Sequence, residues 1–188
     1  LNSGSCRIDE DLLVIGDYLS HPTLFNSRFG TGAGAAITTG NGNVFLGYQT
    51  GYSNTIGINN TFMGAVAGYT NTAGYGNVFN GSASGYNNTT GYSNVFNGGG
   101  SGYTNTTGYN NVMIGTESGL ANSVGNNNTY IGTYSGYLST GSENVFLGYQ
   151  AGYYETGSDK LYIHNTNADS SVATIYADMS TGELRLNG

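Results

Sequence analysis

The sequence predicts an all-β fold in which a parallel β-solenoid winds through about eight turns of 17 residues. Three observations lead to this prediction: a short motif of the type "NVFLG" recurs at a fixed spacing, glycines bound each copy, and the middle of the chain carries no charge. With 33 Gly in 188 residues, a helical fold is excluded, because each Gly in a helix interior costs about 1 kcal/mol. Disorder is also disfavoured, because disordered chains combine high net charge with few aromatic residues.

The recurring motif sets the length of one turn. Its spacing is 17 residues five times and then 16, and its copies begin at Asn43, Asn60, Asn77, Asn94, Asn111, Asn128 and Asn144. In a solenoid, equivalent short strands of successive turns stack in parallel about 4.8 Å apart. We therefore expect each turn to hold the "NVFLG" strand and a second short segment, joined by glycine turns.

The same register extends to both ends of the array. A degenerate first turn begins at Asn26, and an exit strand begins at Lys160. The chain therefore divides into an N-terminal entry segment or cap (1–25), a β-roll repeat domain (26–163) and a C-terminal β-hairpin or connector (164–188). The last segment alternates apolar and polar residues around a Thr-Gly turn, which is typical of a hairpin.

Strand alternation assigns the side chains of each motif to two faces. Both faces are apolar, since Val44 and Leu46 point to one side and Phe45 points to the other. A coil two short strands wide is too thin to bury both, so one face fills the interior and the other is predicted to pack on further copies of the chain. The column that contains Phe45, called the Phe45 column below, is assigned to the oligomer interface or core. It consists of Phe45, Phe62, Phe79, Phe96, Met113, Tyr130 and Phe146. The alternative is a broader, monomeric solenoid in which both layers face a common core.

The distribution of charge excludes several partners. The formal net charge is −7, and no Asp, Glu, Lys, Arg or His occurs from Phe29 to Thr116. Nucleic acids and anionic membrane surfaces require clustered Lys and Arg. No segment approaches the roughly 18 apolar residues of a membrane span. Neither nucleic-acid binding nor membrane insertion is expected.

The same gap argues against catalysis. Acid/base chemistry needs positioned titratable groups, and the two histidines, His21 and His164, lie at opposite ends of the array. Calcium-binding solenoid repeats need an Asp in each turn, which these repeats lack. Cys6 is the single cysteine, allows no intrachain disulfide and is interpreted as an incidental thiol. The chain is therefore not expected to be an enzyme, and no cofactor or metal is predicted.

Two columns of tyrosines repeat along the array. The longer column is interrupted at Leu120, is interpreted as packing between turns or subunits, and consists of Tyr52, Tyr69, Tyr86, Tyr103, Tyr137 and Tyr153. The shorter column, Tyr75, Tyr92 and Tyr109, is confined to the middle turns. Because tyrosine offers a large contact area at low entropic cost, this shorter column is a candidate ligand-binding site for a sugar face or a receptor.

Asn80 and Asn97 form the second candidate site. They place amides in a slot that other turns fill with Leu, Met or Ile, and the same two turns carry "GSASG" and "GGGSG" in place of "GYQTG". Two interpretations stay open. The pair holds the register of adjacent turns, or it marks a polar cavity, a bound ion or a ligand groove.

Regular ranks of Asn and Thr, such as Asn54 and Thr55 with their equivalents 17 residues apart, are what an ice-binding solenoid needs. Adjacent residues of a strand point to opposite faces, however, so an Asn-Thr pair cannot present both side chains on one plane. Ladders that satisfy the backbone at tight turns are the preferred interpretation, and ice binding ranks lower.

The run "NVFLG" with its glycine-bounded turns resembles the "SVAIG"-type repeats in the left-handed β-roll heads of trimeric autotransporter adhesins, and the repeats of phage-tail-type fibre proteins. The closing stretch "NVFLGYQAGYYETGSDKLYIHNT…IYADMSTGELRLNG" is similar to segments that lead into a stalk or an intramolecular chaperone in such fibres. The resemblance covers residues 26–188 at the level of pattern. It implies a left-handed coil, a homotrimer, an extracellular, cell-surface or virion-associated location, and adhesion as the function.

These expectations combine into one functional hypothesis and an alternative. The hypothesis is a trimeric segment of a surface adhesin or tail-fibre-like protein that binds carbohydrate or another envelope component of a target cell. The alternative is a rigid spacer within a fibre. A spacer should have interchangeable turns, whereas a binding site should mark particular ones.

Overall fold

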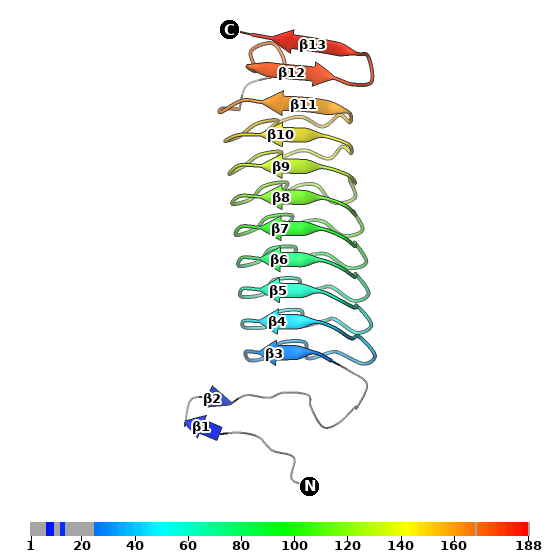
Figure 1. Cartoon of the computed structure of the whole chain (residues 1–188), viewed down its shortest axis with the longest axis vertical. Coiled ribbons are helices and arrows are strands. Elements are labelled where there is room, and N and C mark those ends of the chain that lie inside the picture. The colour runs from blue at the N-terminus through cyan, green and yellow to red at the C-terminus, as the bar shows by residue number, and fades with distance from the viewer. Residues whose placement is uncertain (1–6, 10–11, 14–24, 168, 188) are drawn as a thin grey trace.

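The computed structural model describes residues 7–9, 12–13, 25–167 and 169–187, and within them the protein is all-β, without a helix. The chain winds into a rod whose turns stack along the long axis (Figure 1). The strands of the described residues are, in chain order, β1 (Arg7–Asp9), β2 (Leu12–Leu13), β3 (Ser27–Phe29), β4 (Val44–Leu46), β5 (Thr61–Met63), β6 (Val78–Asn80), β7 (Val95–Asn97), β8 (Val112–Ile114), β9 (Thr129–Ile131), β10 (Val145–Leu147), β11 (Lys160–Ile163), β12 (Ile175–Asp178) and β13 (Glu183–Leu186).

One sheet runs the length of the rod. Strands β3 to β11 pair in parallel in sequence order, and the register places each residue beside its equivalent on the next turn, as with Phe45 and Phe62. Strands β12 and β13 then pair antiparallel at the end of this sheet, while β1 and β2 form a separate antiparallel pair. The β-solenoid of about eight turns that the 17-residue spacing predicts is therefore confirmed.

Each complete turn contains one short strand, and the expected second segment is not a strand. The returning half of the turn bends at residues of positive φ, such as Gln49 (φ 50°) and Gly51 (φ 57°). It still bonds to the next turn, because the Ser53 amide donates to the Tyr69 carbonyl at 3.0 Å. Backbone hydrogen bonds between turns therefore continue around the coil even where the chain is not extended.

The core is a single column of large side chains inside the coil. The seven residues of the Phe45 column have exposed fractions of at most 1 %. The aromatic rings stack along the axis on either side of Met113, with the centroids of Phe62 and Phe79 4.6 Å apart. Because the turn segments close behind each strand, one large side chain per turn fills the interior. All seven belong to the core of one chain, and they present no surface to a partner.

Two sets of glycines permit this close stacking. A Cβ at Gly51 would lie 2.8 Å from the Phe45 ring, so the chain can pass over the core ring only without a side chain. Gly98 has φ 140° and lies directly against the Gly115 carbonyl oxygen of the next turn. Only glycine combines such a backbone conformation with a backbone contact this close.

A ladder of buried asparagines opens every turn of the array. The Asn43 Oδ1 atom accepts hydrogen bonds from the Asn60 amide nitrogen (3.0 Å) and from Asn60 Nδ2 (3.1 Å). In return, Asn43 Nδ2 donates to the Gly57 carbonyl at 2.8 Å. The pattern repeats up the rod through Asn26, Asn43, Asn60, Asn77, Asn94, Asn111, Asn128 and Asn144. These amides satisfy backbone groups at the strand entrance, which buried polar groups require.

Candidate functional site

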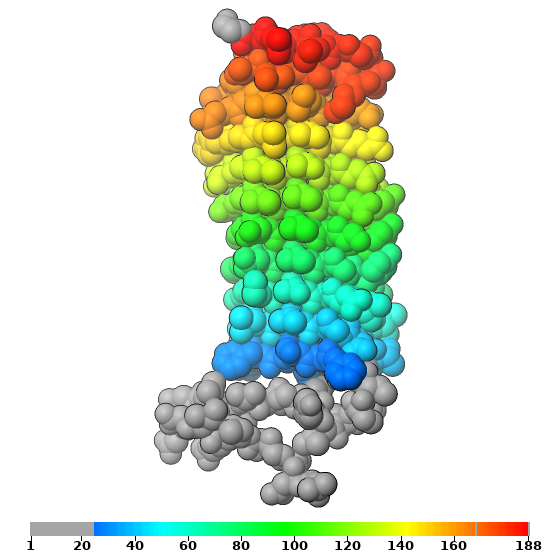
Figure 2. All heavy atoms as spheres, in the orientation of Figure 1, coloured from blue at the N-terminus to red at the C-terminus, as the bar shows by residue number. Residues whose placement is uncertain are grey.

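The outward face of the sheet is uncharged over nine strands. In β4, Phe45 is buried between Val44 (40 % exposed) and Leu46 (45 % exposed), and the same alternation recurs on the following strands. Figure 2 shows the rod from this side, with side chains layered turn by turn. We call this surface the apolar strip, and it consists of Ser27, Phe29, Val44, Leu46, Thr61, Met63, Val78, Asn80, Val95, Asn97, Val112, Ile114, Thr129, Ile131, Val145, Leu147, Leu161 and Ile163. The Val and Leu side of the motif is therefore the face that one chain leaves uncovered.

The structure brings Asn80 and Asn97 together within this strip. They lie side by side on β6 and β7. Both are exposed, and Asn80 Nδ2 donates to Asn97 Oδ1 at 3.4 Å. The residues that follow them are small. A Cβ added at Gly99 would meet no atom closer than 3.9 Å, so neither sterics nor backbone conformation requires a glycine there.

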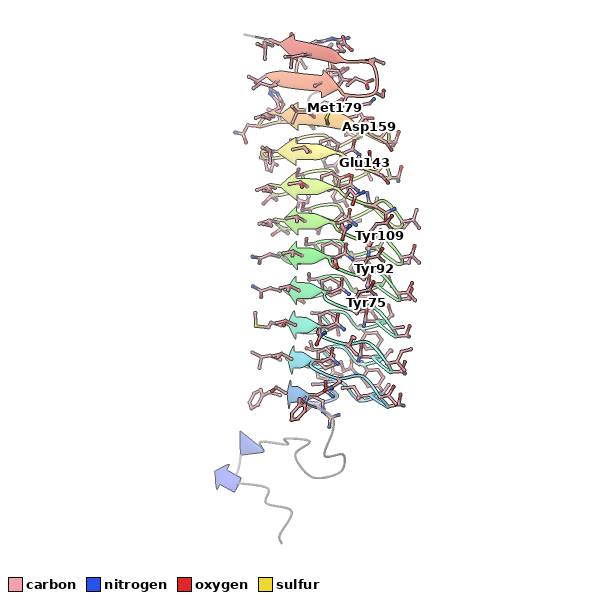
Figure 3. All side chains as sticks on the ribbon, turned by 45° about the vertical axis from the view of Figure 1, so that its right-hand side comes forward. Tyr75, Tyr92, Tyr109, Glu143, Asp159 and Met179 are labelled. Atoms are coloured by element: carbon pink, nitrogen blue, oxygen red, sulfur yellow. The ribbon has the colours of Figure 1, made fainter. Side chains whose placement is uncertain are left out.

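The shorter tyrosine column lies along one edge of the rod (Figure 3). Tyr75, Tyr92 and Tyr109 stack with ring centroids 4.8 Å apart and interplanar angles of 4° and 2°. Partial desolvation and the neighbouring Tyr109 and Tyr75 hydroxyls raise the pKa of Tyr92. By register, Ile58 and Asn126 occupy the positions below and above the stack. Both faces of Tyr92 and the inner faces of Tyr75 and Tyr109 are thus covered by neighbouring rings. Ring edges and hydroxyl groups are what most of the column offers to a ligand.

The longer tyrosine column is half-buried and also self-stacked. The centroid of Tyr52 lies 5.2 Å from that of Tyr69, and the stack continues to Tyr103. It stops at Leu120 and resumes between Tyr137 and Tyr153 at 4.9 Å. In this column, the tyrosines therefore pack between turns of one chain.

The threonine rank, which consists of Thr55, Thr72, Thr89 and Thr106, forms hydrogen bonds with backbone carbonyls. Thr55 Oγ1 donates to the Thr72 carbonyl at 3.0 Å, and Thr72 Oγ1 donates to the Thr89 carbonyl at 3.2 Å. The same bond recurs from Thr89 and from Thr106. A hydroxyl that donates to a carbonyl has no proton left to donate to an ordered water. The rank therefore links the stacked turns to one another.

A pocket that the sequence analysis missed, called the exit pocket below, lies where the chain leaves the last full turn. Its volume is about 240 Å³, and its lining includes Tyr154, Glu155, Thr156, Tyr162, Asn167 and Asp169. One signal in the sequence could have revealed it, because Glu155 occupies a slot that earlier turns fill with Asn or Ser.

The carboxylates of this pocket are fixed in place. Glu155 accepts hydrogen bonds from the Gly157 amide (2.7 Å) and the Tyr162 hydroxyl (2.9 Å). Burial and this bond to Glu155 raise the pKa of Tyr162. Hydrogen bonds from the Ser171 hydroxyl and amide lower the pKa of Asp169.

The described residues hold no cluster of three or more His, Cys, Asp and Glu side chains that could bind a metal ion. The same residues include no helix with the length and hydropathy of a membrane span.

His164 Nδ1 lies 2.9 Å from Thr174 Oγ1, in the loop between β11 and β12. Cys6 and His21 lie outside the described residues.

Comparison of the chain with family models, curated proteins and solved structures yields no match. The fold therefore defines the class, which is a parallel β-solenoid repeat protein with one strand per turn. The function of this particular chain is therefore inferred from the surfaces of the rod.

Proposed function

We propose that the chain is a rigid rod segment of a surface adhesin or tail-fibre-like protein and that it works as a homotrimer. One observation carries this proposal, the uncharged and largely apolar strip that runs along the sheet from β3 to β11. The resemblance of the "NVFLG" repeats to trimeric adhesin heads favours three chains and an extracellular location.

The size of the strip supports self-association. At about 4.8 Å between strands and about 3.3 Å per residue, it measures roughly 40 by 10 Å. Patches of this size are often functional, and larger contiguous apolar patches are rare on monomers. In a parallel trimer whose strips line the rotation axis, each strip faces the same strip of the other two chains.

The interior supports the role of a stiff rod. Rings, asparagines and threonines each bond or stack to their equivalents on the next turn, so every turn is fixed by its two neighbours. In such a quasi-one-dimensional protein, stability adds up from the interfaces between turns. Length and rigidity are the properties that a fibre needs.

Oligomer mass measured by light scattering tests the proposal. We expect a trimer for the natural chain and a monomer for Ile131→Glu, because a charge in a buried interface loses its water without gaining a partner. Thr107→Glu is the matched control, since Thr107 is exposed on the returning half of a turn and its variant should remain trimeric. A soluble monomer for the natural chain would refute the proposed trimer.

Carbohydrate binding at the exit pocket is a second candidate function, and Tyr154 is the observation that favours it. The residue is 63 % exposed, and its ring makes an edge contact with the Tyr153 ring at an interplanar angle of 62°. Sugars bind to a free aromatic face with carboxylates and amides beside it, and Glu155 and Asn167 supply these groups. Three copies in one trimer would add avidity.

A glycan array tests this second function. Tyr154→Ala should abolish binding, while Tyr92→Ala should leave it unchanged because both faces of Tyr92 are covered by neighbouring rings. Loss of binding in Tyr92→Ala alone would instead assign the site to the shorter tyrosine column.

A further inference from the structure

Asn80 and Asn97 interrupt an otherwise apolar column. The third residue of each strand in the strip is Leu46 or Met63 on the turns before them, and Ile114 or Ile131 on the turns after them. The single bond between the two amides uses Asn80 Nδ2 and Asn97 Oδ1. Within the described residues, Asn80 Oδ1 and Asn97 Nδ2 have no protein partner.

The fold of one chain does not require amides at these positions. The buried asparagines at the strand entrances each make several hydrogen bonds to backbone and side chains, as Asn94 does with Asn77 and Gly108. The Asn80 to Asn97 bond is longer, at 3.4 Å, and lies in solvent. Its contribution to the stability of the isolated coil is therefore small, and an apolar residue would serve the coil equally well.

We propose that the Asn80 and Asn97 pair sets the axial register between copies of this chain. The inference rests on the self-association proposed above, with the apolar strip as the contact surface. When parallel copies are aligned turn for turn, the amides of one chain meet the amides of the next. Each amide carries both donors and an acceptor, so the unused Asn80 Oδ1 and Asn97 Nδ2 atoms can bond between chains.

If one chain slips along the next by one turn, the amides no longer meet amides. A displacement of about 4.8 Å would place Asn97 against Ile114 of a neighbouring copy, or Asn80 against Met63. The amide would then lose its water without gaining a partner, which is unfavourable. The rest of the strip cannot oppose a slip in this way, because Ile114, Ile131 and Leu147 offer similar shapes on successive turns. A polar residue in an apolar interface that fixes register is a well-attested use of buried amides.

The repeat itself identifies the occupant of the strip as further copies of this chain. A surface with the same spacing per turn can match nine consecutive strands, and another copy provides that spacing. The strip also carries no charge, so copies do not repel one another along it.

Disulfide trapping tests the register directly. In a Cys6→Ser background, a tagged chain with Ile114→Cys is refolded together with an untagged chain carrying Ile131→Cys, and the oligomers are oxidised. A disulfide needs Cα atoms within about 7 Å. Alignment turn for turn therefore yields 114 to 114 and 131 to 131 links, and a slip of one turn yields 114 to 131 links. Chain size distinguishes the three products.

The variant pair is Asn80→Ile with Asn97→Ile, residues already present in the same column. We expect the share of 114 to 131 links to rise roughly tenfold or more, because one unpartnered amide layer no longer opposes the slip. The matched control is Thr90→Ile with Thr107→Ile, which adds the same two side chains to the same two turns but outside the strip. It should leave the share unchanged.

The outcomes distinguish failure of the register role from failure of the proposed self-association. Oligomers in which the Asn80→Ile and Asn97→Ile variant keeps the low share of mixed links would overturn the register role and leave self-association standing. Oligomers without 131 to 131 links would assign the interface to another face and overturn the inference. A monomeric mass for the natural chain would overturn the proposed function itself.

Discussion

The Tyr130 hydroxyl oxygen lies 2.8 Å from the Ser139 hydroxyl oxygen inside the coil. Tyr130 belongs to the Phe45 column, in which the preceding turns have Phe or Met. Ser139 occupies the slot that the preceding turns fill with Asn. This is also the first turn shortened to 16 residues. The hydroxyl on the ring therefore fills the space left by the shorter side chain and satisfies Ser139.

The second asparagine ladder ends at the same place. It consists of Asn54, Asn71, Asn88 and Asn105, which are joined by side-chain bonds of 2.7–2.8 Å. Asn122 instead donates to the Gly141 carbonyl at 3.0 Å. The Asn105 Oδ1 atom is then left buried without a partner among the described residues. At the shortened turn, the hydrogen bonds between successive Asn side chains are thus replaced by bonds to the Gly141 carbonyl and between Tyr130 and Ser139.

Tyr130→Phe should change the alkaline stability of the protein. Burial raises the pKa of Tyr130 to about 12, against 10.0 for the free group. The folded state therefore holds the proton more tightly. The resulting stabilisation, about 2 to 3 kcal/mol, is fully present below pH 10 and is lost as the pH rises toward 12.

Urea unfolding at pH 8 and pH 11 measures this effect. At pH 8, Tyr130→Phe should be less stable than the natural chain by about 1 to 2 kcal/mol, because Ser139 loses its partner. At pH 11 the two proteins should differ less. Tyr149→Phe, on the exposed surface, is the control. A difference that stays constant between the two pH values would contradict the assignment.

Asn88→Ala should destabilise the rod much more than Asn87→Ala. Asn88 is fully buried, donates to Asn71 Oδ1 at 2.7 Å and accepts from Asn105 Nδ2 at 2.8 Å. Its loss leaves buried groups unsatisfied on two neighbouring turns, and we expect a cost of about 2 to 4 kcal/mol. Asn87 makes no such side-chain bond, so its variant should stay within about 0.5 kcal/mol of the natural chain. Chemical denaturation measures both, and equal effects would argue against the ladder as a source of stability.

Gly98→Ala and Gly99→Ala should differ although the residues are adjacent. A Cβ at Gly98 would overlap the backbone of Gly115 at a φ of 140°, whereas a Cβ at Gly99 would have its nearest neighbour, the Ser82 carbonyl oxygen, at 3.9 Å. We expect Gly98→Ala to lower the free energy of unfolding by at least about 3 kcal/mol and Gly99→Ala to change it by at most about 1 kcal/mol. Thermal unfolding followed by circular dichroism provides the measurement. Similar melting temperatures for the two variants would show that the turns can separate at little cost.

Acid should loosen the C-terminal hairpin. The Lys160 ammonium lies 2.6 Å from Asp178 and joins β11 to β12. Hydrogen bonds from Lys160 and then Ser180 lower the pKa of Asp178 from 3.8 to about 2. Because the folded-state pKa is the lower one, this contribution is present above pH 3.8 and is lost as the pH falls toward 2.

Hydrogen exchange of the β12 and β13 amides, corrected for intrinsic rates, checks this. Asp178→Asn should exchange faster than the natural chain at pH 5, and the two should converge near pH 2. Glu183→Gln, in the exposed pair with Arg185, is the control variant. Hairpin protection that is the same in Asp178→Asn and the natural chain at pH 5 would contradict the prediction.

The sequence by itself determined the period, the position of the strand and the parallel register. When Phe45 and Phe62 recur every 17 residues, only stacking equivalent positions buries every ring, so periodicity alone selects the solenoid. The hairpin at the end also followed from local alternation and turn residues. The marked turns of Asn80 and Asn97 were visible for the same reason, as departures from a regular repeat.

The tertiary structure alone decided how each turn closes, and with it which face is covered. Val44 and Phe45 are both apolar, so composition cannot say which fills the coil. That choice depends on the backbone bends at residues such as Gly51, which bring the returning segment behind the Phe45 ring. The spacing of 4.8 Å that stacks Tyr75, Tyr92 and Tyr109 also hides their faces. The exit pocket forms only where the regular coil ends, because residues brought together by an irregular loop leave no period to detect.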